Sequence, residues 1–305
     1  MEGRVFKSTG SWYEVIGIDG KKYNCRLQGK IRLDEIKESN PVTVGDRVEL
    51  LIENDDASIK EIKPRDNHIL RQSVKRVGHS QVLAANVDQV MLIATIRQPR
   101  TSLGFIDRFL VSAESFRIPQ ILVLNKKDIL GFKEREIATQ LKDLYESIGV
   151  TTVIISANDK DDVLELKRLL AKKTTLVAGH SGVGKSTLLN QLSPELDQST
   201  SEVSEFTNKG THTTTFAEMF MIDESTFVID TPGIKEWGLV EMNQQEISDY
   251  FPEMRDLRLD CKFGSRCLHL TEPQCNIRKA VEEGKIAVNR YSSYVSMVMG
   301  EDNRK

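Results

Sequence analysis

The sequence predicts a multidomain α/β protein: an N-terminal OB-type β-barrel, then a domain with a mainly parallel sheet, then a helical C-terminal domain that binds metal. Three observations predict this order. Residues 1–65 are rich in short strand patterns and turns. From residue 87, apolar strands alternate with helical patterns around a glycine-rich loop. Three of the four cysteines cluster near a histidine late in the chain. We expect domains at residues 1–65, 66–240 and 241–305.

Composition narrows the class of protein. The chain has 305 residues, 39% hydrophobic residues and a net charge of −3, so it can bury an ordinary core and is not a globally basic nucleic-acid binder. Any RNA contact must come from local patches. No apolar run has the length of a membrane span, and the N-terminus lacks a signal-peptide core. We therefore expect a cytoplasmic protein with no membrane partner, whose cysteines stay reduced.

The first 65 residues predict the barrel. Asp19-Gly20 is a hairpin turn signal, and Tyr23, Cys25 and Leu27 alternate with polar neighbours along one strand, where Cys25 is a core residue. Five strands in so short a stretch favour a barrel of the OB type, which often binds oligonucleotides. A barrel that only docks against another domain fits the pattern equally well. The strand patterns span residues 5–9, 12–18, 22–29, 47–52 and 58–62.

Residues 64–80 form a polar connector with several basic side chains, among them Arg65, Arg71, Lys75 and Arg76. Its composition favours a solvated linker. The alternative is a local strip that contacts phosphates.

The middle of the chain alternates strand and helix patterns. This alternation predicts a parallel sheet with helices on both faces. Ligands of such sheets bind at the carboxyl ends of the strands. Strands are expected at residues 90–96, 120–124, 151–155, 174–178 and 226–229, and helices at 103–116, 133–148, 163–170 and from 186.

A phosphate-binding motif, G-x-x-x-x-G-K-[ST], follows the strand at 174–178 and opens a helix. Its backbone N–H groups curl around an anion at the positive end of the helix dipole. Lys185 would reach the β- and γ-phosphates, and the Ser186 hydroxyl would bind Mg²⁺. The alternative is a chance glycine-rich turn. The loop and its flank comprise Gly179, His180, Ser181, Gly182, Val183, Gly184, Lys185, Ser186 and Thr187.

Asn125-Lys126-Lys127-Asp128 follows the strand at 120–124. A carboxylate there accepts hydrogen bonds from the ring N–H and exocyclic amine of guanine, a donor pair that adenine does not present. The alternative is that Asp128 caps the next helix. Ser156-Ala157 follows another strand and resembles the element that backs the base in GTPases.

Asp230-Thr231-Pro232-Gly233 follows the strand at 226–229. Asp230 would hold Mg²⁺ through water and the Gly233 N–H would meet the γ-phosphate, although a simple Pro-Gly turn also fits. The polar stretch before this strand ends at residues 210–215, where we expect Thr214 to ligate Mg²⁺ as a switch residue. His212 is either an exposed loop residue or the group that positions the attacking water.

The order of these motifs is permuted. Ordinary GTPases begin with the phosphate loop and place Asn-Lys-x-Asp late, whereas here the guanine motif comes first. A circular permutation of this kind is physically permitted, because the site is assembled in space and surface loops tolerate recutting.

Cys261, Cys267, His269 and Cys275 form a soft-ligand set suited to tetrahedral structural Zn²⁺. A group of buried thiols is the alternative. Residues 276–299 read as one long helix or a broken pair, with basic side chains available to face outward: Arg278, Lys279, Lys285 and Arg290.

Together these motifs resemble the bacterial ribosome small-subunit-dependent GTPase A family over almost the whole chain. The resemblance implies a circularly permuted GTPase that binds GTP or GDP with Mg²⁺, holds Zn²⁺, binds ribosomal RNA, acts late in small-subunit maturation and is stimulated by the small ribosomal subunit. Two features depart from expectation. Cys261 and Cys267 are one residue further apart than expected, and Ile234 stands where Ras-like enzymes have a glutamine.

The leading hypothesis is thus a monomeric, Mg²⁺-dependent GTP hydrolase. Its rival is a nucleotide-gated RNA-binding assembly factor in which turnover is incidental, and Ile234 keeps that rival open. A metabolic ATP-binding enzyme is more distant, because Asp128 argues against adenine.

Overall fold

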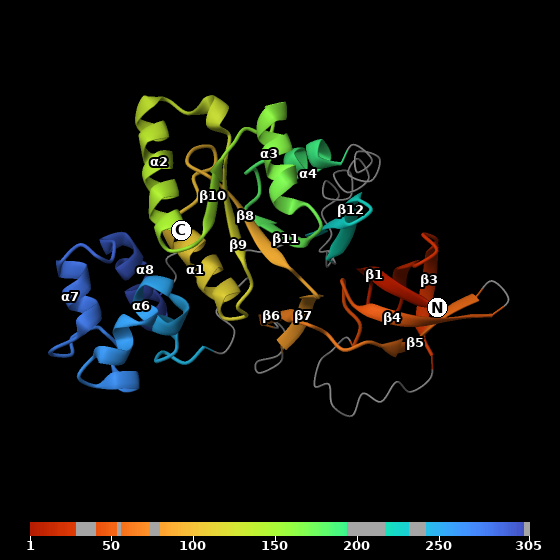
Figure 1. The fold of residues 1–305 in the computed structure, drawn as a ribbon, viewed down its shortest axis with the longest axis horizontal. Coiled ribbons are helices and arrows are strands. Elements are labelled where there is room, and N and C mark those ends of the chain that lie inside the picture. The colour runs from red at the N-terminus through yellow and green to blue at the C-terminus, as the bar shows by residue number, and fades with distance from the viewer. Residues whose placement is uncertain (29–40, 54–55, 73–79, 194–216, 232–241, 302–305) are drawn as a thin grey trace. The chain divides into compact units, whose positions relative to one another are not determined.

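The computed structural model describes residues 1–28, 41–53, 56–72, 80–193, 217–231 and 242–301 (Figure 1). The chain forms two compact units. Unit 1 comprises residues 1–91 and 157–236, and unit 2 comprises residues 92–156 and 237–305.

Unit 1 begins with the barrel. Its strands pair in the order β1-β2-β3-β5-β4, and β4 pairs back onto β1, which closes the barrel. Alternating residues fill its interior, among them Val5, Val15, Ile59 and the predicted core residue Cys25, all completely buried. The OB-type prediction is therefore confirmed. The strands are β1 (Glu2–Ser8), β2 (Tyr13–Gly17), β3 (Lys22–Leu27), β4 (Arg47–Glu53) and β5 (Asp56–Ile62).

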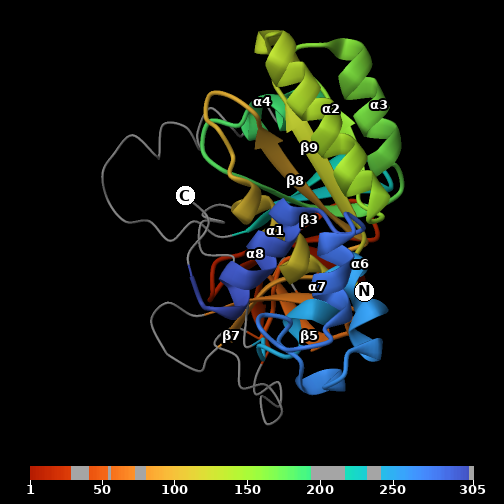
Figure 2. The ribbon, with the colours of Figure 1, turned by 90° about the vertical axis from the view of Figure 1, so that its left-hand side faces the viewer.

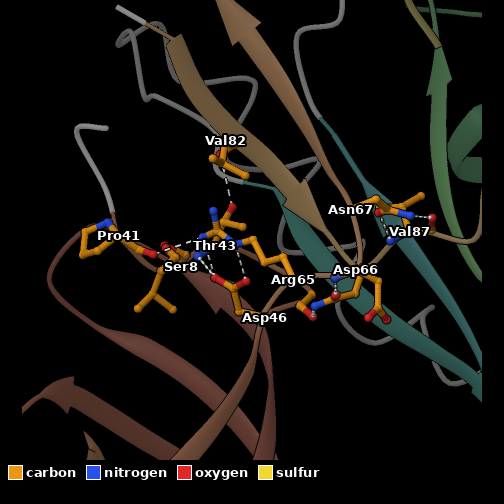
Figure 3. A network of polar contacts seen from close by, with 12 residues as sticks. Ser8, Pro41, Thr43, Asp46, Arg65, Asp66, Asn67, Val82 and Val87 are labelled. Carbon is orange, nitrogen blue, oxygen red and sulfur yellow. Dashed lines mark hydrogen bonds and ion pairs between the residues drawn. The ribbon is translucent and has the colours of Figure 1, made fainter. Parts of the chain in front are cut away.

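The connector is folded, and the expectation of a solvated linker is wrong for its described part. Strands β6 (His68–Gln72) and β7 (Ser80–Ala85) pair antiparallel. The Arg65 side chain is only 16% exposed, and its Nε and Nη2 donate to the fully buried Asp46 carboxylate at 2.7 and 2.9 Å (Figure 3). The composition of the connector does not show this pairing, because the two partners lie 19 residues apart in the chain.

Further contacts join the barrel to the β6–β7 hairpin (Figure 3). The Thr43 hydroxyl donates to Val82 O at 3.2 Å, while the Thr43 N–H donates to Asp46 at 2.8 Å. Gly45 has a φ of +92°, and a Cβ there would lie 2.0 Å from Ala85 O. Only glycine therefore permits this approach of the barrel loop to β7.

The phosphate-loop half of the sheet also belongs to unit 1. β11 (Thr174–Gly179) pairs parallel with β13 (Thr226–Asp230), and β13 pairs antiparallel with β12 (Glu218–Asp223). β12 in turn pairs antiparallel with β1 of the barrel. Helices α3 (Lys160–Leu170) and α4 (Lys185–Leu192) accompany these strands. The sequence patterns predicted β11 and β13, but not β12, in which charged and apolar residues mix.

Unit 2 carries the remaining strands, in the order β10-β9-β8: β8 (Gln89–Thr95), β9 (Gln120–Asn125) and β10 (Thr151–Ile154). β8 runs into this unit from residue 92 onward. All its residues are buried, as a strand covered on both faces requires. Helices α1 (Leu103–Glu114) and α2 (Phe132–Ser147) match the predicted positions.

The C-terminal part of unit 2 is built from short helices. Residues 276–299 form a broken pair, α7 and α8, as one of the two sequence alternatives proposed, and Gly284 has a φ of +71° in the break. Helix α1 packs against α8 (Figure 2), and Val111 of α1 shares a core with Phe251 and Tyr294. The helical elements are η4 (Ile247–Tyr250), α6 (Pro252–Arg255), η5 (Leu257–Asp260), η6 (Gly264–Arg266), α7 (Asn276–Glu282) and α8 (Val288–Val298).

Arg290 does not face outward, so the expectation for this residue is wrong. Its side chain is 2% exposed, and it donates to Asp107 of α1 at 2.6 Å and to Glu253 of α6 at 2.7 Å. Tyr145 of α2 also donates to Asp107, at 2.9 Å. Burial opposes the charged guanidinium, but the two carboxylates outweigh burial and raise the pKa of Arg290. A buried ion-pair network therefore joins α8 to the helices of the sheet.

Candidate nucleotide and metal sites

The glycine-rich loop lies between β11 and α4, as predicted. Gly182 and Gly184 have φ values of +83° and +91°, a region that side-chain-bearing residues rarely adopt. Val183 between them is completely buried and anchors the loop, and Leu188 and Leu189 bury the inner face of α4. The backbone is thus shaped as a strand–loop–helix anion cradle.

Two residues predicted for the phosphates and the magnesium ion meet beside this loop. Lys185 Nζ lies 2.5 Å from Asp230 Oδ1, with the two side chains 18% and 25% exposed. Val177 of β11 and Asp230 of β13 are direct strand partners, and the Thr231 hydroxyl donates to Val177 O at 3.1 Å. The first residue of α4 and the last residue of β13 therefore place a cation and a carboxylate together at the carboxyl ends of the adjacent parallel strands, where hard oxygen donors for Mg²⁺ belong.

The switch predictions cannot be placed. His212, Thr214, Gly233 and Ile234 lie outside the described residues, so their roles stay predictions.

The Asn-Lys-x-Asp element follows β9 in unit 2. Asn125 ends β9 and is 2% exposed. Lys126 adopts a left-handed φ of +68°, and its Nζ donates to Gln98 O at 2.6 Å. The Lys127 N–H donates to Ile155 O at 2.9 Å, which holds this turn beside the residue that precedes Ser156. Short 3₁₀ helix η1 then spans Lys127–Ile129.

Asp128 does not cap the following helix, which removes the alternative explanation for its carboxylate. Helix α2 has Gly131 as its N-cap, and the Gly131 N–H donates to Glu134 at 2.6 Å. Asp128 is exposed on η1 and can meet a base from solvent. Ser156 and Ala157 are 2% and 5% exposed.

The four predicted metal ligands converge. Their ligand atoms all lie within 4.8 Å of one another, and all four residues are buried. His269 Nδ1 lies 3.5 Å from Cys261 Sγ and 3.4 Å from Cys275 Sγ. Three thiols and one imidazole at this spacing fit the donor set of a structural zinc site.

A second layer of hydrogen bonds holds the backbone beside His269. Tyr291 and Tyr294 of α8 donate to the carbonyls of His269 and Leu268, at 2.5 and 2.8 Å. The Glu272 carboxylate accepts from the Leu268 N–H at 2.7 Å. Sequence reasoning missed these residues, because aromatic residues at helical spacing read as ordinary core.

Burial shifts the pKa values of two of these residues, Cys267 and His269. It raises the pKa of Cys267 to about 12 and lowers the pKa of His269 to about 4. A neutral imidazole is the form that binds metal, and a cation reverses the penalty on buried thiolates. His269 therefore has the neutral form that a cation requires, and a bound cation would favour the thiolate form of Cys267.

Comparison with known families gives two matches. The RsgA GTPase model matches residues 62–240, and the RsgA N-terminal domain model matches residues 2–59. A small ribosomal subunit biogenesis GTPase RsgA from Christiangramia forsetii is 46% identical over 99% of this chain and 97% of its own length. The protein of the same name from Cytophaga hutchinsonii is 46% identical over 100% of both chains.

Solved structures agree with this comparison. YjeQ from Thermotoga maritima is similar with a TM-score of 0.78 and 32% identity, covering 100% of this chain and 99% of its own. YloQ, described as a circularly permuted GTPase, gives a TM-score of 0.76 and 30% identity over 100% and 96% of the two chains. Among the helices that the structure describes, none has the length and apolar character of a membrane span.

Proposed function

The chain belongs to the RsgA GTPase family and is a GTP hydrolase, and from this premise we propose how its residues serve that activity and where it acts. The observation that carries the proposal is the meeting of Lys185 and Asp230 beside the glycine-rich loop. A lysine at the start of α4 and a carboxylate at the end of β13 are the groups that a nucleotide with Mg²⁺ requires.

The phosphates of GTP bind the loop amides of residues 179–187 in this proposal. Lys185 moves its charge from Asp230 to the β- and γ-phosphates, and Asp230 and the Ser186 hydroxyl face the metal. When bound, Mg²⁺ neutralises charge that develops on the phosphate oxygens. The residues of the chain orient the nucleotide for in-line attack by water.

Guanine is selected by the exposed carboxylate of Asp128, with Asn125 and Lys126 shaping the turn around the base. Ser156 and Ala157 line the base from the next strand. From their motif positions, we assign Thr214 to the magnesium ion, the Gly233 N–H to the γ-phosphate and His212 to the attacking water.

The four-ligand cluster holds one Zn²⁺ with a structural role. Three cysteines and one histidine fill all four tetrahedral positions, so no position is left for a substrate.

The partner is the small ribosomal subunit. Relatives that match almost the whole chain carry the name small ribosomal subunit biogenesis GTPase. The OB-type barrel provides a fold that binds oligonucleotides, so ribosomal RNA is the surface that this protein contacts, as a monomer in the cytoplasm. The subunit raises the rate of hydrolysis during late maturation of that particle.

The experiment that tests the site is phosphate release from GTP and from ATP by the wild-type protein and by Lys185→Ala. We expect release from GTP, little from ATP, and loss of turnover with weaker nucleotide binding in Lys185→Ala, because phosphate contacts are lost. Lys172→Ala, a lysine outside the loop in the same unit, is the matched control and should behave as wild type. Equal turnover by wild type and Lys185→Ala would contradict the assignment.

A further inference from the structure

Four charged residues of unit 1 form a row from the barrel to the phosphate loop. Lys7 of β1 is the strand partner of Glu218 of β12, which lies beside β1 in Figure 1. Glu218 is in turn the strand partner of Asp230 of β13. Lys7 Nζ lies 3.1 Å from Glu218 Oε2, and Lys185 Nζ lies 2.5 Å from Asp230 Oδ1. We call Lys7, Glu218, Asp230 and Lys185 the charge row.

The middle of the charge row is electrostatically unfavourable by itself. Directly opposite residues of antiparallel strands point to the same face, with Cβ atoms about 5 Å apart, and like charges in that arrangement repel. Glu218 and Asp230 are such a pair. Each carboxylate is balanced by its own cation at its outer side, and both are about three-quarters buried, at 28% and 25% exposure. Partial burial keeps solvent from fully screening them.

We propose that Lys7 and Glu218 are positioning residues for the nucleotide site. Lys7 cancels the charge of Glu218, so that Lys185 is not drawn toward a second carboxylate and stays available for phosphates. Asp230 keeps the negative charge that attracts Mg²⁺. This inference rests on the proposed function, in which Lys185 binds phosphates and Asp230 faces the metal. Strand β1 of the barrel thus contributes to the electrostatic environment of a site whose proposed ligands come from other segments of the chain.

Substitution of the two partners has opposite expected effects. Lys7→Gln leaves an uncompensated negative charge beside Asp230, so affinity for the polyanionic nucleotide GDP falls, by about threefold in low salt. Glu218→Gln leaves an uncompensated positive charge, so GDP affinity rises by a similar factor. The double variant Lys7→Gln/Glu218→Gln restores the net charge and returns close to wild type. Lys7→Arg keeps the charge and also stays close to wild type.

The measurement is the dissociation constant of a fluorescent GDP analogue, with EDTA and again with Mg²⁺. A divalent cation prefers the added negative charge, so the gain in affinity on adding Mg²⁺ grows in Lys7→Gln and shrinks in Glu218→Gln. Both shifts diminish in 1 M salt, where the Debye length is about 3 Å.

The control pair is Lys60 of β5 and Glu49 of β4 in the same barrel, whose Nζ and Oε1 lie 3.4 Å apart. Lys60→Gln and Glu49→Gln make the same charge changes at residues that are not strand partners of the charge row, since Glu49 pairs with Glu2 of β1 and not with Lys7, and should leave GDP affinity unchanged. Circular dichroism of every variant verifies that the barrel is folded.

The pattern of signs decides the question. Opposite shifts that cancel in the double variant support the proposal. Shifts in the same direction would show that the pair only holds β1 against β12, and unchanged affinities would show no coupling; either result overturns the proposal. Lys185→Ala and Asp230→Asn are measured beside them. If Lys185→Ala and Asp230→Asn also leave GDP and Mg²⁺ binding intact, the proposed function itself fails. If these two variants lose binding while the Lys7 and Glu218 variants bind as wild type does, only the positioning role is refuted.

Discussion

At the scale of single residues, we propose that Asp128 bears the specificity for the base. Its carboxylate is exposed on η1, and the cap of the next helix is made by Gly131 and Glu134 instead. Its chemistry is therefore available for guanine. When a ligand leaves a buried polar group of the site without a hydrogen-bond partner, the loss of binding free energy is large enough to discriminate strongly between related ligands.

We predict that Asp128→Asn weakens GTP binding by at least about 100-fold, or about 2.7 kcal/mol, and favours xanthosine nucleotide, whose edge carries an acceptor where guanine has a donor. Competition of unlabelled GTP and XTP against a fluorescent nucleotide measures both affinities. Asp143→Asn on α2 is the matched control. Unchanged GTP affinity in Asp128→Asn would remove this residue from the site.

Arg290 is a fully buried charged residue whose pairing matters for stability. It is paired with Asp107 and Glu253, and its guanidinium lies 4.5 Å from the centre of the Phe251 ring. Removal of the arginine leaves two buried carboxylates without their cation, which typically costs about 3–5 kcal/mol.

We therefore predict that Arg290→Met lowers the free energy of unfolding by about 3 kcal/mol or more. Urea unfolding followed by circular dichroism measures it. Lys279→Met on α7 is the control, because Lys279 is 70% exposed and its surface pair with Glu283 contributes little. A loss below about 1 kcal/mol in Arg290→Met would mean that the network is not a net stabiliser in this fold.

At the scale of elements, the sequence predicts features whose residues lie close together in the chain, and it does not predict contacts between distant residues. The glycine-rich loop, the Asn-Lys-x-Asp turn and the cysteine cluster have fixed spacings. The first two follow the strands predicted to precede them, and the four residues of the cluster converge. Helices α1 and α2 and the barrel strands follow from periodicity. The charge row, in contrast, unites residues up to 211 positions apart in one ion pair, and no local pattern shows it.

The same reasoning explains the corrections. Arg290 belongs to an amphipathic helix on which an arginine ordinarily faces water, and its partners Asp107, 183 residues away, and Glu253, 37 residues away, make burial possible. Arg65 lies in a stretch with the composition of a polar linker, and its burial depends on pairing with Asp46, 19 residues away. β12 has little apolar periodicity, and its place is set by pairing with β13 and β1.

We propose that zinc bound by the four-ligand cluster stabilises the short helices around residues 257–275. These helices are three or four residues long and cannot be stable by themselves. The binding energy of a structural metal ion becomes folding energy for such a segment.

We predict one equivalent of zinc in protein purified without added metal, and loss of local structure when a strong chelator removes it. Elemental analysis measures the first, and the near-ultraviolet circular dichroism of Tyr291 and Tyr294, whose hydroxyls bond to the backbone beside His269, reports the second. Cys275→Ser should release the zinc, whereas Cys25→Ser in the barrel core should retain it. A chain that contains no zinc and is fully folded would contradict the structural role.

At the scale of the whole molecule, the two compact units divide the functional elements between them. Unit 1 holds the barrel, the glycine-rich loop and Asp230, while unit 2 holds Asn125 to Asp128 and the metal cluster. Each unit thus carries part of the permuted GTPase motifs and one further module, which is the barrel in unit 1 and the metal cluster in unit 2. A ligand can shift the equilibrium between states only by binding them differently, so a ribosomal particle that prefers the GTP-bound state must also tighten GTP binding.

The most direct test of the central claim is the rate of phosphate release from GTP, at fixed Mg²⁺, as purified small ribosomal subunits are added. We predict slow release by the protein alone and a rise of about tenfold or more with small subunits, which lowers the barrier by about 1.4 kcal/mol. Large subunits should leave the rate unchanged, and Lys185→Ala should show no release in either case. A rate that stays constant across the titration, or that rises equally with large subunits, would contradict a GTPase activated by the small subunit and favour an assembly factor in which turnover is incidental.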